Sequence, residues 1–128
     1  MNKVRRKRIA SVIETLENIT GYDLIETAKD EIEDILWEED DAYNNMPENL
    51  QYSMRGEESS DAIDSLQEAV DVLEEAIDAL NELYDLKEEY NNIKDEDEKV
   101  EKESEIELKE DDIDERINEA INSLEDII

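Results

Sequence analysis

Several residue types that carry enzyme chemistry or build tight loops are missing or rare in this chain. Its 128 residues include no Cys, no His and no Phe, and only two Gly, one Pro and one Trp. Without Cys there is no disulfide framework and no thiolate site. Without His the usual general base and the commonest zinc ligand are lost. So few turn-forming residues argue against a β-sandwich or β-barrel.

Basic residues are also scarce, and most of them lie in one place. The chain carries 42 acids and 13 bases, for a net charge of −29, and Lys3, Arg5, Arg6, Lys7 and Arg8 open the sequence. Such a charge opposes compaction and, with low hydropathy, is typical of disorder. The apolar residues nevertheless fall on helical stripes, so we expect an ordered fold. No continuous apolar run suits secretion or a membrane span, and we expect a cytoplasmic protein.

The strongest pattern occupies residues 62–96, which read as five seven-residue units: AIDSLQE, AVDVLEE, AIDALNE, LYDLKEE and YNNIKDE. Apolar residues fill the first two places in four of the units, Asp recurs at the third place, and Glu always stands at the seventh. A strict period of seven favours left-handed, coiled-coil-like packing. Recurring Ala widens the apolar face and lets a second helix approach closely.

Shorter stripes and turn signals predict the remaining elements. Thr20-Gly21-Tyr22-Asp23 should separate the first two helices, with Asp23 and Glu26 forming an acidic capping box. Ser59, Ser60 or Asp61 should cap the third helix. We expect a single all-α domain, an elongated antiparallel bundle or coiled coil of three to four helices. The predicted helices cover residues 3–19, 24–45, 61–93 and 104–128, with a loop over 46–60 and an acidic connection over 94–105 that is either an exposed helical extension or frayed.

Two sets of carboxylates form the candidate partner-binding surface. A rigid helix lined with carboxylates can imitate a nucleic-acid backbone, which carries one negative charge per about 1.7 Å of duplex axis. The alternative is a solvated coat that keeps a coiled coil soluble. The first set comprises Asp64, Asp71, Glu74, Asp78, Glu82, Asp85 and Glu89, and the second comprises Glu38, Glu39, Asp40 and Asp41.

Other chemistry is less well supported by the sequence. The runs 38–41 and 95–98 lack the spacing and the Gly of a calcium loop, so we expect no metal and no cofactor. The acids should lie outward, without an aromatic cleft, and we expect no enzymatic activity. The basic N-terminal residues could bind nucleic acid, but the rest of the chain is acidic and would repel a phosphate backbone. These bases should instead pair with the chain's own acids or orient the protein on a partner.

The apolar residues near Pro47 admit two interpretations. Either they plug the end of the bundle or they form a partner-binding tip. Trp37 should be half-buried at the edge of its helical stripe, and Arg55 should tie the loop to a carboxylate. The residues around the turn are Tyr43, Met46, Leu50, Tyr52 and Met54.

The turn AYNNMPENLQYSMRGE, followed by heptads containing AID and preceded by the basic start MNKVRRK, resembles a family of small acidic proteins of phages and mobile elements in gut Firmicutes. The resemblance covers roughly residues 1–90 and implies no catalytic residues. It does imply a phage context, in which small acidic proteins often block host defence nucleases, including CRISPR effectors and restriction enzymes. The compartment would then be the host cytoplasm.

Two functions follow from these observations. The first is a non-enzymatic inhibitor that mimics nucleic acid and blocks the binding groove of a host nuclease or CRISPR effector, with no direct nucleic-acid or membrane partner. The second is a structural or assembly protein that pairs through its apolar stripes, for example as a homodimer, while its charge serves solubility.

Overall fold

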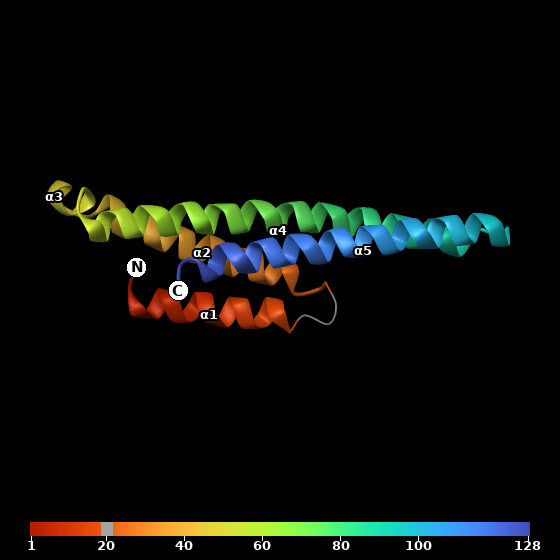
Figure 1. Cartoon of the computed structure of the whole chain (residues 1–128), viewed down its shortest axis with the longest axis horizontal. Helices are drawn as coiled ribbons and strands as arrows, with labels where there is room; N and C mark the ends of the chain where they lie inside the picture. Colours follow the sequence, from red (N-terminus) through yellow and green to blue (C-terminus); the bar gives the residue numbers. More distant parts are fainter. Residues whose placement is uncertain (19–21) are drawn as a thin grey trace.

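The computed structural model of this chain describes residues 1–18 and 22–128, and the described residues form helices joined by short connections (Figure 1). The expected all-α bundle is confirmed. The bounds of the helices are α1 Lys3–Glu17, α2 Ile25–Asn44, the single turn α3 Glu48–Gln51, α4 Met54–Asn92 and α5 Glu96–Glu125.

The four long helices pack in a cycle. α4 packs most extensively against α5 and then against α2, while α1 closes the cycle by contacting α2 and α5. Successive long helices run in opposite directions, and α4 and α5 form the longest pair (Figure 1). This hairpin continues past α1 and α2 at one end, and α3 protrudes at the other end. The described residues therefore form a bundle of four long helices with different structures at its two ends.

The heptad stripe of α4 forms the centre of the core, as its period predicts. Leu66, Leu73 and Leu83 are fully buried, as are Ala69 and Ala76 on the neighbouring line. Because α4 contacts helices on two sides, its buried face is wider than one seam, and the alanines permit the close approach of a neighbouring helix. Tyr84 is the exception among the predicted stripe residues, since half of its surface stays exposed.

α4 begins earlier than the sequence predicts. The predicted loop over 46–60 contains α3 and the first turns of α4, and the N-cap is Ser53, whose Oγ accepts from the N–H of Gly56 at 3.4 Å. Ser59 is buried inside the helix and caps nothing. Gly56 reads as a loop residue, but it fits a close contact: a Cβ there would lie 2.1 Å from the carbonyl oxygen of Gln51.

The start of α2 also differs from the expectation. Its N-cap is Leu24, with no side-chain hydrogen bond, so the predicted capping box of Asp23 and Glu26 does not form. The predicted break includes Thr20 and Gly21, which lie outside the described residues.

The acidic connection over 94–105 is helical almost throughout, which corresponds to the first of its two expected forms. Asp95 caps α5 by accepting from the N–H of Asp97 at 2.9 Å. Glu96, Asp97 and Glu98 occupy the first turn, where negative charge interacts favourably with the helix dipole. Only residues 93–95 separate α4 from α5.

We call residues 84–112 the arm, because they form the end of the α4–α5 hairpin. None of these residues is buried, although the same two helices are well buried nearer the bundle, up to Leu83 and from Ile113 onward. The arm is therefore a two-helix extension without a core of its own. In the parts of the chain that the structure describes, no helix has the length and apolarity needed to cross a membrane.

Candidate functional site: the acidic face of the hairpin

All seven predicted acids of α4 are exposed. The third-place residues of the heptads recur about every 10.5 Å along the helix axis, at about 1.5 Å per residue. They differ, however, in what surrounds them. We call the five that form no ion pair with a described residue the outer carboxylates: Asp64, Asp71, Glu74, Asp78 and Asp85.

The other two acids belong to an inter-helix ladder that the sequence analysis missed. Lys102 Nζ lies 2.8 Å from Glu89 Oε2, and Lys109 Nζ lies 2.6 Å from Glu82 Oε2. Arg116 pairs with Glu75 one heptad further along. Lys102 Nζ donates hydrogen bonds to the carboxylates of Glu89 and Glu105, and these bonds raise the pKa of Lys102. The ladder connects α4 and α5 along one edge of the hairpin.

The ladder reduces the number of carboxylates that are available to a partner. Its spacing is also visible in the sequence. The three bases lie seven residues apart on α5, and their partners lie seven apart on α4. An antiparallel pair places such residues opposite one another at every heptad, in the manner of flanking charges in a coiled coil. Glu82 and Glu89 are therefore partly neutralised, and among the predicted acids of α4 only the outer carboxylates have no ion pair with a described residue.

The second predicted set does not form a single surface. Glu38 is bound to Arg8, and Asp40 accepts from the side-chain amide of Asn44 at 3.4 Å, while Asp41 is exposed. Glu39 is only 1% exposed. The prediction that Glu39 contacts a partner is wrong, because a buried carboxylate cannot reach one.

Glu39 is instead the centre of a buried polar cluster. Arg5 Nε donates to its Oε2 at 2.8 Å, Ser59 Oγ donates to its Oε1 at 2.6 Å, and the amino group of Met1 lies 3.5 Å away. Burial alone would raise the pKa of Glu39, but the hydrogen bonds from Ser59 and Arg5 and the nearby amino group outweigh it and lower the pKa. The cluster joins α1, α2 and α4.

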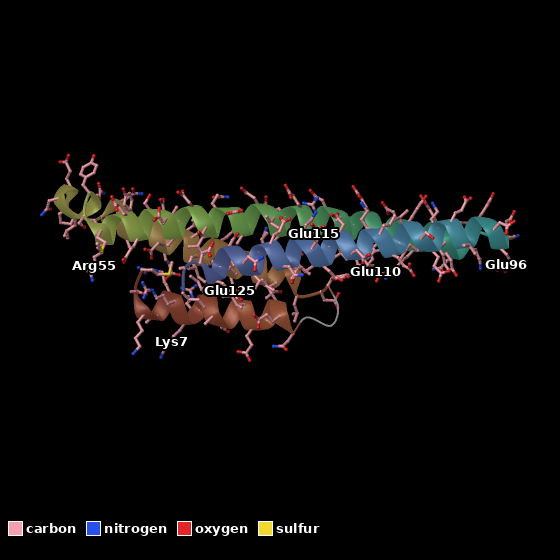
Figure 2. All side chains as sticks on the ribbon, in the orientation of Figure 1. Lys7, Arg55, Glu96, Glu110, Glu115 and Glu125 are labelled. Carbon is pink, nitrogen blue, oxygen red and sulfur yellow. The ribbon has the colours of Figure 1, made fainter. Side chains whose placement is uncertain are left out.

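The basic start divides into an inward and an outward part. Arg5 pairs with Glu39, and Arg8 pairs with Glu31 and Glu38 on α2, as expected for bases that match the chain's own acids. Lys3, Arg6 and Lys7 are exposed, and Lys7 projects away from the bundle on α1 (Figure 2). Figure 2 also shows oxygen-tipped side chains along the whole hairpin, from Glu125 to Glu96.

The residues around the Pro47 turn do not plug the bundle. Tyr52 and Met54 are 79% and 76% exposed, Leu50 is also exposed, and only Tyr43 and Met46 are partly covered. Of the two interpretations of this turn, the plug is therefore wrong, and the partner-binding tip stays a prediction.

Two further expectations for single residues fail. Trp37 is 61% exposed instead of half-buried. It directly follows the buried Leu36, but it faces outward because successive helical residues point about 100° apart. Arg55 forms no ion pair with any residue the structure describes, so it does not tie the loop to a carboxylate.

Within residues 1–18 and 22–128, no group of three or more carboxylates is arranged to hold a metal ion. Searches with family models, among curated proteins and among solved structures found no match to this chain. The candidate function therefore rests on the acidic face itself.

Proposed function

We propose that this protein is a non-enzymatic inhibitor whose α4–α5 hairpin occupies the nucleic-acid groove of a host defence protein, such as a CRISPR effector or a restriction nuclease. One observation carries the proposal. The outer carboxylates recur along one side of a long helix, all of them are exposed, and no base of the described structure pairs with them. The type of host protein is suggested by the resemblance of the turn and the heptads.

The charge of the hairpin is of the right order. α4 carries 13 acids and two bases, and α5 carries 14 acids and four bases, so the two helices together carry a net −21. The 39 residues of α4 extend about 58 Å. One net charge then falls on about every 2.8 Å, between the values of about 3.4 Å for one strand and about 1.7 Å for a duplex. A groove lined with Lys and Arg would accept such a rod.

The alternative function is assembly through the apolar stripes, and it requires these stripes to be exposed. The stripe of α4 is buried against α2 and α5 of the same chain. The stripe is therefore not free to pair with a second chain, and this supports the inhibitor over assembly by that route.

The decisive experiment neutralises part of the acidic face without changing its shape. Asp71→Asn, Asp78→Asn and Asp85→Asn together remove three charges from exposed positions. Binding to purified host nucleases and CRISPR effectors would be measured with and without competing duplex DNA. We expect the triple variant to bind on the order of tenfold to a hundredfold more weakly, because three ion pairs with the groove are lost.

A matched control removes the same charge elsewhere. Glu14→Gln, Glu17→Gln and Glu26→Gln change three exposed acids of α1 and α2, and this variant should bind almost as well as the parent. Binding of the parent should also weaken steeply with added salt, since the carboxylates replace phosphate contacts. Affinity that does not change with salt, or equal affinity for the two triple variants, would overturn the proposal.

A further inference from the structure

The turn between α2 and α4 and the first turns of α4 carry a group of exposed residues, which we call the tip: the apolar Leu50, Tyr52 and Met54 and the charged Arg55 and Glu58. Tyr52 and Met54 are the most exposed of its apolar members. On α4, Glu58 lies three and four residues after Arg55 and Met54, so the three side chains share one side of the first turns. Tyr, Met and Arg are the residue types enriched in protein interfaces.

The backbone beneath the tip is held in a defined shape. Gln51 Nε2 donates to the carbonyl of Tyr43 at 2.9 Å, and Ser53 Oγ donates to the carbonyl of Leu50. Gly56 brings the first turn of α4 against the backbone of Gln51, where a Cβ has no room. The apolar side chains therefore project from a built turn, and binding through them requires little ordering of the backbone.

The tip also differs from the rest of the molecule in charge. Residues 42–56 contain one acid, Glu48, and one base, Arg55, whereas the whole chain carries −29. Glu57, Glu58 and Asp61 follow on the first turns of α4, so the turn itself is close to neutral and the helix beyond it is acidic. Two copies therefore repel each other less across residues 42–56 than across the acidic faces of α4 and α5.

From these observations we propose that the tip binds the tip of a second copy, in a two-fold symmetric dimer. In such an interface each residue contacts its partner reciprocally. Tyr52 and Met54 of the two copies cover one another, and the unpaired Arg55 of each copy meets Glu58 of the other. Because the tip and the arm lie at opposite ends of the molecule (Figure 1), this arrangement keeps the two acidic arms as far apart as possible. It does not depend on the proposed inhibitor function.

Sedimentation velocity of the full chain, from about 1 µM to about 1 mM, tests the proposal. We expect the mass to rise from 14.9 kDa toward twice that value as concentration increases. Tyr52→Ser with Met54→Ser should raise the dissociation constant at least about tenfold, because exposed anchor residues are lost. Leu108→Ser, which removes an exposed apolar residue of the arm, is the matched control and should dimerise like the parent. Circular dichroism would verify that each variant remains helical.

A charge exchange makes the test specific to the reciprocal pair. Arg55→Glu and Glu58→Arg should each weaken self-association, since each places like charges opposite one another twice. An equimolar mixture of the two variants should form a heterodimer as readily as the parent dimerises. A monomer over the whole concentration range, a dimer unaffected by the tip substitutions, or a mixture that stays monomeric would overturn the proposal.

Discussion

Glu39→Gln should lower the stability of the fold more than most single substitutions of similar size in this protein. The substitution keeps the size of the side chain but removes the charge that faces Arg5 and the amino group of Met1. Breaking a buried ion pair by neutralising one partner typically costs about 3–5 kcal/mol. Arg5 keeps 14% of its side chain exposed and can turn partly toward water, so we expect a loss of about 2–3 kcal/mol in the free energy of unfolding.

The pH dependence of this loss has a definite sign. The pKa of Glu39 is lower in the folded protein than its ordinary value of 4.5. The unfolded chain therefore binds the proton first, and the stabilisation is fully present above about pH 4.5 and disappears as the pH falls through the folded pKa. Relief of repulsion among the surface carboxylates changes stability over the same range, but parent and variant share that effect. The difference between them should shrink below about pH 4.5.

Urea unfolding followed by far-UV circular dichroism would measure both effects at a series of pH values. Glu74→Gln is a suitable control, because this glutamate is exposed on α4, and it should change stability by no more than about 0.5 kcal/mol. If Glu39→Gln unfolds at the same urea concentration as the parent near neutral pH, the cluster does not stabilise the fold. If the difference persists unchanged in acid, the carboxylate is not the group responsible.

Three other predictions concern the ends and edges of the bundle. Gly56→Ala should lower the free energy of unfolding by about 1–3 kcal/mol in a thermal melt, because the contact with Gln51 outweighs the better helix propensity of Ala; a more stable variant would show that the contact relaxes freely. Arg116→Glu should lower the melting temperature at low salt, and adding Glu75→Arg should restore most of the loss, whereas additive losses would contradict their pairing. Amides of the arm should exchange hydrogen faster than those of residues 62–83, because the arm has no buried residue; equal protection would contradict this.

The period of α4 could be predicted because it repeats without interruption, but its beginning could not. Gly56 and the neighbouring serines have the composition of a loop, and only the packing of Gln51 against Gly56 shows that the helix includes them. The cap is Ser53 instead of the predicted Ser59, Ser60 or Asp61. The start of α4 is therefore set by a tertiary contact, because local helix propensity does not determine it.

The acidic residues were likewise only partly predictable from the sequence. Exposure of the α4 acids follows from their place in the heptad, and the structure agrees. The run of acids at 38–41 places Glu39 among surface carboxylates, although Glu39 falls in phase with the buried Ile32, Ile35 and Leu36 of α2. Arg5 likewise falls in phase with the buried residues of α1. A charged residue on each of two apolar stripes is the signal of a buried pair, and the density of acids around Glu39 concealed it.

The two proposals concern different surfaces of the molecule, and this makes their failures distinguishable. The three residues changed in the nuclease test, Asp71, Asp78 and Asp85, lie about 24 to 45 Å along α4 from Arg55, about three screening lengths or more at physiological salt. Charge changes at one site therefore leave the field at the other almost unaltered. If both proposals hold, a dimer presents two acidic hairpins and should bind two nucleases. A variant with Tyr52→Ser and Met54→Ser would then bind one nuclease per monomer with unchanged intrinsic affinity. If that variant loses nuclease binding, the tip itself contacts the nuclease and the assignment of the binding surface to the hairpin fails.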